Sequence, residues 1–325
     1  TDAAISDTAS GSVTIKGGIS TNVTGLTPNS TYYVQADGSL GSPTASIPYD
    51  ISGATYVQNF SVFSQEGAPV DLAFNTDGTK MFVVGVAADN VNEYTLGVGF
   101  DVSTAVYSQS FSVAAQDTDP YAIAFNNDGT KMFIVGIAGQ DVNEYSLTTG
   151  FDVSTASFVD SFSVAAQDTS PTGLAFNGDG TKMFVVGYTG RDVNEYELSA
   201  GFDVSTATYS QSFSVAAQET KPYGMDFNND GTKMFIAGEV GQDISEYSLT
   251  TGFDVSTASF VSSFSVAAQE ATPTGIVFST DGTKMFIIGF TGDAVNEYST
   301  GVGSVTTVLA GKALSSTSIN LDYTT

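Results

Sequence analysis

The stretch from Pro171 to Gly187, PTGLAFNGDGTKMFVVG, decides the fold because the chain carries five versions of it. Its Asp-Gly-Thr-Lys-Met unit recurs every 51 residues, which places the same glycine at Gly78, Gly129, Gly180, Gly231 and Gly282. A proline and a glutamate keep the same interval, at Pro69, Pro120, Pro171, Pro222 and Pro273 and at Glu93, Glu144, Glu195, Glu246 and Glu297. So strict a repeat indicates one supersecondary unit per copy.

Each copy of the repeat is predicted to form four short β-strands. In the second copy, residues 121–125 are apolar and run into Asn-Asn-Asp-Gly, a hairpin signal. Residues 131–136 form a buried apolar run, residues 141–147 a third strand, and residues 157–164 an alternating fourth strand. Four strands in roughly 50 residues, with no helical periodicity, are typical of a propeller blade. The sequence therefore predicts an all-β, five-bladed β-propeller.

Counting the strand motifs predicts how the ring closes. The segment from Tyr49 to Tyr56 matches the segment from Phe151 to Phe158, so one fourth-strand motif precedes the first complete copy. After Tyr298 the fifth copy loses this motif. We therefore expect residues 55–62 to complete the last blade, which removes the open strand edges.

Ring closure also predicts the domain organisation. The propeller spans residues 49–303 and its two ends lie side by side, so the flanks can meet. Residues 1–48 plus 304–325 are predicted to form one small discontinuous β module, with strands at 12–17, 31–36 and within 306–323. Insertion of a domain whose ends are close is well tolerated, so this module would be the base on which the propeller is carried.

The charge balance excludes several partners. The chain has 35 acidic and 9 basic residues, a formal net charge of −26. Nucleic acid and anionic membrane surfaces are therefore poor partners, and no apolar run is long enough for membrane insertion. His and Cys are absent, which removes the commonest general base and the commonest zinc ligands. Trp is absent too, so sugar stacking would depend on 15 Tyr and 23 Phe.

The blade motif resembles the NHL- and YVTN-type propeller repeats over residues 49–300. Those families are mostly binding scaffolds, with some enzymes among them. The flanks resemble the two halves of a short module of bacteriophage tail-fibre and appendage proteins: Gly25-Leu-Thr-Pro-Asn-Ser-Thr-Tyr-Tyr-Val-Gln-Ala-Asp-Gly-Ser-Leu and Val308-Leu-Ala-Gly-Lys-Ala-Leu-Ser-Ser-Thr-Ser-Ile-Asn-Leu. In that family the halves run on directly, whereas here a propeller separates them. The resemblance implies a virion-surface or extracellular location, other virion proteins as partners, and a homotrimeric or fibre-like context.

Several charged residues recur in every copy, which favours a structural role. Five lysines match the five glutamates one for one, at Lys80, Lys131, Lys182, Lys233 and Lys284. We interpret them as one ion pair per blade rather than as a functional ring of charge. The Asp-Gly turns lack the full Asp-x-Asp-x-Asp-Gly series and the glutamate of a calcium loop, so they are interpreted as hairpin turns. The aspartate of each Gly-Phe-Asp-Val-Ser-Thr turn is expected to bond within its own turn.

The segment before each proline carries one carboxylate per copy. By propeller geometry these carboxylates surround one mouth of the channel. Because hard cations favour oxygen ligands, they form a candidate cation ring, with Ca²⁺ as the only cofactor to consider; five solvated carboxylates are the alternative interpretation. The residues are Glu66, Asp117, Asp168, Glu219 and Glu270.

Differences between the copies cluster in two loops of the same face, the segment around each proline and the loop between the second and third strands. Recognition residues usually lie in such loops of a rigid scaffold, although neutral drift at exposed positions is the alternative. Aromatic residues there could stack on sugars, and Arg191 and Lys221 could hold an acidic group. The candidate ligand-binding residues are Tyr121, Tyr188, Arg191, Lys221, Tyr223, Glu239 and Phe290.

No complete catalytic motif is present, so the sequence favours a non-enzymatic structural and binding protein. Our first hypothesis is a phage tail fibre, appendage or capsid decoration that displays the propeller to a host-surface glycan or protein. The alternatives are a secreted bacterial lectin or adhesin, and a glycan-active enzyme with its site in the channel. Only Asp226, which replaces Ala73, Ala124, Ala175 and Val277 on an inner strand, stands out for the last alternative.

Overall fold

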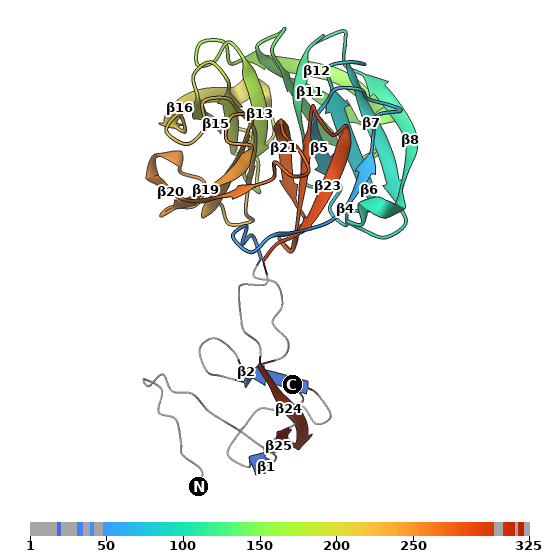
Figure 1. Cartoon of the computed structure of the whole chain (residues 1–325). Helices are drawn as coiled ribbons and strands as arrows, with labels where there is room; N and C mark the ends of the chain where they lie inside the picture. The colour runs from blue at the N-terminus through green and yellow to red at the C-terminus, as the bar shows by residue number, and fades with distance from the viewer. Residues whose placement is uncertain are drawn as a thin grey trace. The chain divides into compact units, whose positions relative to one another are not determined.

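The computed structural model describes residues 48–301 in full, and the backbone of residues 18–20, 31–34, 40–41, 308–315 and 318–321. The chain divides into two compact units, one of which is Ser46–Gly301. This unit contains five antiparallel four-stranded sheets arranged around one axis, a five-bladed β-propeller (Figure 1). The all-β, five-bladed prediction is confirmed.

We number the blades 1–5 by their inner strands. The inner strands are β5 (Pro69–Phe74), β9 (Pro120–Phe125), β13 (Pro171–Phe176), β17 (Pro222–Phe227) and β21 (Pro273–Phe278). The second strands are β6 (Lys80–Gly85), β10 (Lys131–Gly136), β14 (Lys182–Gly187), β18 (Lys233–Gly238) and β22 (Lys284–Gly289). The third strands are β7 (Asn90–Leu96), β11 (Asp141–Leu147), β15 (Asp192–Leu198), β19 (Asp243–Leu249) and β23 (Ala294–Ser299). The outer strands are β8 (Ala105–Ser112), β12 (Ala156–Ser163), β16 (Ala207–Ser214), β20 (Ala258–Ser265) and, in blade 5, β4 (Thr55–Ser61).

Strand β4 closes the ring by pairing with β23, as the strand count predicts. The register runs from Ala294 opposite Ser61 to Ser299 opposite Thr55. Tyr49 takes the place of the phenylalanine that precedes this strand in the other blades, and its N–H donates to the carbonyl of Gly282 at 2.8 Å. Blade 5 therefore combines the first and the last strands of the propeller sequence. This pairing closes the ring of blades (Figure 1).

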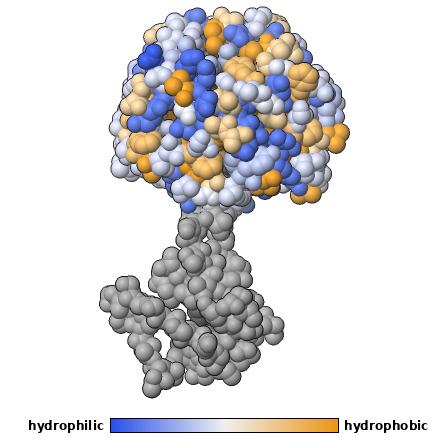
Figure 2. Space-filling view, viewed as in Figure 1, coloured by the Kyte–Doolittle hydropathy of each residue, from blue (hydrophilic) through white to orange (hydrophobic). Residues whose placement is uncertain are grey.

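The core lies between neighbouring blades. The second strands are buried along nearly their whole length because each is covered by a blade on either side. Aromatic rings interlock across these interfaces: the Phe82 and Phe125 ring centroids are 4.6 Å apart, and so are those of Phe74 and Phe286. Apolar and polar residues are interspersed over the visible side of the propeller (Figure 2).

The Asp-Gly turns between first and second strands have the local chemistry that the sequence predicts. In blade 3, Asp179 Oδ1 accepts hydrogen bonds from Thr181 N at 3.0 Å and Thr181 Oγ1 at 2.6 Å. Gly180 has φ +70°, and a Cβ on it would run into the ring of Phe202. Glycine is therefore required here by both the backbone conformation and the space. Asp203 likewise caps its own turn, accepting from Ser205 N at 3.2 Å at the start of a short 3₁₀ helix, Val204–Thr206.

The second unit is described by its strands alone. They form one sheet in the order β1-β25-β24-β2-β3, from β1 (Gly18–Ser20), β2 (Thr31–Val34), β3 (Leu40–Gly41), β24 (Val308–Ser315) and β25 (Ser318–Leu321). Strands from both sides of the propeller sequence thus pair in one sheet, with Thr31 opposite Lys312 and Gly18 opposite Leu321. The strand expected at residues 12–17 lies outside the described residues.

The chain enters and leaves the propeller beside the Asp-Gly turns. Tyr49 N bonds to Gly282 O, and Gly301 N donates to Asp50 O at 2.7 Å. In an antiparallel blade, the turns after the first and third strands lie at one end, and the other loops lie at the opposite end. The variable loops are therefore on the face opposite the two points where the chain enters and leaves.

Candidate binding site

The two sets of variable loops are joined to each other in each blade. The segment around each proline lies against the end of the second strand, as in the pairing of Pro222 with Gly238. One backbone bond then ties the two loops together: Tyr188 N to Ser170 O at 2.9 Å, for example, and Glu239 N to Lys221 O at 3.3 Å. The structure thus places both sets on one face, which we call the variable face.

Four aromatic side chains of the variable face converge on the channel mouth, and we call them the mouth cluster: Tyr121, Tyr188, Tyr223 and Phe290. The Tyr121 and Tyr223 rings are stacked, with centroids 6.0 Å apart and an interplanar angle of 16°. Phe290 stands nearly perpendicular to both, at 6.4 and 6.3 Å. Tyr188 lies 6.3 Å from Tyr223. These residues come from blades 2, 3, 4 and 5, so the cluster spans the mouth.

The stacked pair in this cluster forms because blades 2 and 4 carry a tyrosine directly after the proline, where the other blades carry a smaller residue. The residues after the proline in blades 1, 3 and 5 are Val70, Thr172 and Thr274, all buried. Thr172 Oγ1 donates to the carbonyl of Pro222 at 3.1 Å, so it stays inside the blade interface. Tyr121 and Tyr223 are too large for that space and remain half-buried over the mouth. Burial, with Asp119 nearby, raises the pKa of the Tyr121 hydroxyl.

Lys221 and Glu239 form an ion pair at the edge of the mouth cluster. Lys221 Nζ lies 2.9 Å from Glu239 Oε1 and 5.9 Å from the centroid of the Tyr188 ring. The hydroxyl of Tyr223 donates to Glu239 Oε2 at 3.4 Å. The hydrogen bond to Glu239 raises the pKa of Lys221, and burial, followed by the charge of Glu239, raises the pKa of Tyr223. The positive charge of Lys221 is therefore already balanced by the Glu239 carboxylate, which weakens the expectation that Lys221 holds an acidic group.

Among residues 48–301, the ring, cation–π and ion-pair contacts of the mouth cluster do not include Arg191. Its φ is 58°, its N–H donates to Gly187 O at 3.0 Å, and its carbonyl accepts from Val215 N at 2.9 Å. Asp89, Gln140, Gln242 and Asp293 also have a positive φ in the other blades, so the position is a turn that leads directly into the third strand. The Arg191 side chain is exposed, and the ion pairs within residues 48–301 use lysines only. The structure brings together the other six candidate residues and not this one.

The carboxylates of the candidate cation ring are buried. Glu66, Asp117, Asp168, Glu219 and Glu270 are 0–2% exposed. Each folds back onto its own blade: Asp168, for example, accepts from Ser170 N at 2.7 Å and from Gly190 N at 2.6 Å. Their interpretation as solvated groups is therefore wrong, because backbone N–H groups of both variable loops draw them inward. Nor does the described part of the chain bring three acidic side chains together as a Ca²⁺ site would require.

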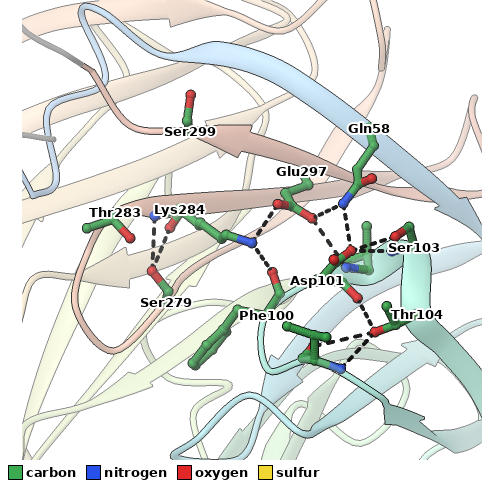
Figure 3. Close-up of polar contacts among 12 residues, drawn as sticks. Gln58, Phe100, Asp101, Ser103, Thr104, Ser279, Thr283, Lys284, Glu297 and Ser299 are labelled. Atoms are coloured by element: carbon green, nitrogen blue, oxygen red, sulfur yellow. Dashed lines mark hydrogen bonds and ion pairs between the residues drawn. The ribbon is translucent and has the colours of Figure 1, made fainter.

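The repeated lysines and glutamates form the expected ion pairs, which also join the blades. At the closure between blades 5 and 1, Lys284 Nζ lies 2.8 Å from Glu297 Oε1 and donates to the carbonyl of Phe100 at 2.5 Å (Figure 3). Glu297 Oε2 accepts from Gln58 Nε2 at 2.9 Å and from Val102 N at 3.2 Å. This network recurs around the ring, so these charges belong to the scaffold and not to a site.

Two carboxylates lie inside the channel on inner strands. Asp226 of β17 accepts from Phe227 N at 2.8 Å and, across the blade interface, from Phe278 N at 2.9 Å. Asp71 of β5 accepts from Ile123 N of the next blade at 3.0 Å. Burial raises the pKa of Asp226 to about 7 and raises the pKa of Asp71 well above its usual range, with Asp226 contributing to the latter.

Sequence reasoning missed Asp71, although the signal was present. It is the only charged residue at a position that Ala122, Gly173, Gly224 and Gly275 occupy in the other copies. The same comparison that singled out Asp226 would have found it.

A shallow hollow lies at the opposite mouth, beside the Asp-Gly turns. Its volume is about 250 Å³, and it is lined by residues that include Phe74, Phe125, Val277 and Phe278. A chain of hydrogen bonds between neighbouring blades borders it, such as Thr280 Oγ1 to Thr76 O at 2.7 Å. The lining repeats from blade to blade, unlike the mouth cluster.

Comparisons with known proteins add no family. No protein-family model and no curated protein matches the chain. Similar solved structures include a protein of unknown function from Desulfotomaculum acetoxidans, with 15% identity and a TM-score of 0.43. They also include a candidate 6-phosphogluconolactonase from Bacteroides uniformis (14%, 0.45) and a protein from Lactobacillus plantarum (11%, 0.46).

These matches cover 68%, 74% and 78% of this chain and 62%, 70% and 74% of the other chains, respectively. The chain thus spans less than two thirds of the first of them. Likeness at this level carries no argument about function. Separately, no helix in the described residues has the length and apolar character needed to cross a membrane.

Proposed function

We propose that this protein is a non-enzymatic binding module whose variable face recognises a carbohydrate on a cell surface. One observation carries the proposal: the mouth cluster is built from positions at which the five copies differ. Residues that serve the propeller recur in every blade, whereas Tyr121, Tyr188, Tyr223 and Phe290 break the repetition and still meet at one place. Selection for a shared surface explains that convergence better than independent drift in four loops.

The chemistry of the mouth cluster suits a sugar. Aromatic rings offer apolar faces to the C–H side of a pyranose, and Tyr188 is 39% exposed, which leaves ring surface for contact. Glu239, Asp119 and the tyrosine hydroxyls can accept or donate hydrogen bonds to sugar hydroxyls around these rings. The points where the chain enters and leaves the propeller lie at the opposite face, so the mouth cluster is separate from them.

The flanks support a proposal about where the propeller is displayed. The flanks resemble the tail-fibre and appendage module, and β2, which precedes the propeller in the sequence, pairs with β24, which follows it. Both observations favour a single attachment unit. We propose that this unit binds other virion proteins, in a homotrimer, so that the propeller faces outward from the virion surface. Particle imaging with an antibody against the propeller tests this part separately.

A glycan array with the full chain tests the binding proposal. We expect a restricted set of glycans to bind, and Tyr188→Ala to weaken that binding about tenfold or more. Tyr209→Ala is the matched control, because Tyr209 is also exposed but lies on the outer strand β16. Equal binding by both variants, or no bound glycan at all, would remove the proposal.

The two channel carboxylates support a second candidate, a glycan-active enzyme. A carboxyl with pKa about 7 and a second carboxylate in the same channel are the groups that glycoside hydrolysis uses. Both are held by backbone N–H donors of neighbouring blades, which equally suits a structural role. Product analysis on a bound glycan separates the two: cleavage that Asp226→Ala abolishes would establish the enzyme, and an intact glycan would exclude it for that ligand.

A further inference from the structure

We propose that the mouth cluster binds an organic cation, a primary amine or quaternary ammonium group carried by the ligand, which takes the place now held by the ammonium of Lys221. This inference rests on the proposed function and specifies the ligand's chemistry. Three observations support it. The Lys221 ammonium is an internal cation already bound there, the variable face is strongly acidic, and the fold does not need the Lys221–Glu239 ion pair.

The Lys221 ammonium shows that the site stabilises a cation. It lies over the Tyr188 ring at 5.9 Å from the centroid, and Glu239 contacts it at 2.9 Å. Tyr223, in turn, donates its hydroxyl to the other oxygen of the Glu239 carboxylate. Ring faces and a carboxylate held in this way are the chemistry by which proteins bind ammonium groups. An external ammonium group would find the same partners.

The charge of the variable face favours a cationic ligand over an acidic one. The loops of this face and the first residues of the third strands carry two basic residues, Arg191 and Lys221, against twelve carboxylates, seven of which are partly exposed. Such a surface attracts cations and repels anions over several ångströms of solution. The carboxylates are Glu66, Asp89, Asp117, Asp119, Asp141, Asp168, Asp192, Glu219, Glu239, Asp243, Glu270 and Asp293.

The Lys221–Glu239 pair is not needed by the fold, so it is free to exchange. The backbone N–H of Lys221 bonds to the Glu219 carboxylate at 2.7 Å, and Ala68, Asp119, Ser170 and Thr272 make the same bond without a lysine. At the position of Glu239 the other copies have Val86, Ile137, Tyr188 and Phe290. The Lys221 side chain is 36% exposed, and an ion pair at that exposure is weak enough for a ligand to replace.

Choline and its uncharged isostere 3,3-dimethylbutan-1-ol test the inference. Both are titrated by NMR into the full chain at low salt, with Lys221→Ala, Glu239→Gln and Tyr209→Ala as variants. We expect choline to bind at least about tenfold more tightly than the isostere. We also expect Lys221→Ala to tighten choline binding about threefold to tenfold, Glu239→Gln to weaken it similarly, and Tyr209→Ala to leave it unchanged.

Equal binding of choline and its isostere, no binding of either, or no effect of Lys221→Ala would overturn the inference. The glycan array distinguishes this failure from failure of the proposed function. Neutral glycans that bind through Tyr188 while choline does not would leave the binding module intact and remove only the cationic ligand. Ligand binding that is insensitive to both Tyr188→Ala and Glu239→Gln would remove both proposals.

Discussion

Tyr121 and Tyr223 stack 6.0 Å apart across the channel mouth, although they belong to blades 2 and 4, which are not neighbours. They sit at the same position of the 51-residue repeat, where the intervening blade has the buried Thr172. The alternation of large and small residues lets two side chains reach the axis together. A five-fold scaffold thus acquires one asymmetric surface through side-chain differences at a repeated position.

Replacing Gly180 by Ala should destabilise the propeller, whereas the same change at Gly178 should not. Gly180 has φ +70° and its Cβ would meet the Phe202 ring, while a Cβ on Gly178 meets nothing within 4 Å. We expect a loss of about 2–4 kcal/mol in the free energy of unfolding for Gly180→Ala and less than about 0.5 kcal/mol for Gly178→Ala. Urea unfolding followed by circular dichroism measures both. Equal losses would show that the turn does not require glycine.

Gly178→Asn should stabilise the protein. In four blades the residue at this position donates a side-chain hydrogen bond to the carbonyl of its counterpart in the next blade, as Asn127 Nδ2 does to Gly178 O at 2.7 Å. Gly178 has no side chain with which to continue the series to Asn229. We expect Gly178→Asn to exceed Gly178→Ala in unfolding free energy by about 0.5–1 kcal/mol. An Asn variant no more stable than the Ala variant would contradict this account.

Glu297→Ala should weaken the closure of the ring. The change leaves the ammonium of Lys284, the amide of Gln58 and the N–H of Val102 without their shared acceptor (Figure 3). We expect a loss of about 2–4 kcal/mol of unfolding free energy. Glu197→Ala, an exposed glutamate of β15, is the control and should change it by less than about 0.5 kcal/mol. A similar small loss in both variants would mean that the network does not hold the blades together.

Asp226 should make stability fall as pH rises. Its pKa of about 7 in the folded protein lies above the ordinary 3.8, so the folded state binds this proton more tightly than the unfolded state. The resulting stabilisation is complete below about pH 3.8 and is lost as pH rises through about 7. We expect the unfolding free energy of the wild type minus that of Asp226→Asn to decrease across this range. A constant difference from pH 4 to pH 8 would show that Asp226 titrates normally.

The repeat made most of the fold predictable. The match of Tyr49 and its neighbours to Phe151 and its neighbours predicted the closing strand, because a propeller needs every outer strand filled. The same comparison of copies picked out six residues that the structure brings to the channel mouth. The class of fold and the location of the variable face therefore follow from the sequence alone.

What the sequence could not supply was side-chain direction within the loops. Asp168 and its equivalents turn inward because N–H groups of two separate loops converge on them, and such convergence has no sequence signature. Arg191 stands at a turn with positive φ, a backbone feature that the residue type does not reveal. The pairing of Lys221 with Glu239 joins residues 18 positions apart in different loops, so it too required the structure.

The central claim, that the mouth cluster is the binding surface, is tested most directly by calorimetric titration of one array-selected glycan into four forms of the full chain. These are the wild type, Tyr121→Ala, Tyr223→Ala and the outer-strand control Tyr209→Ala. The account predicts that both mouth variants lose at least about tenfold in affinity while the control keeps the wild-type value. Retention of full affinity by Tyr121→Ala and Tyr223→Ala would contradict it.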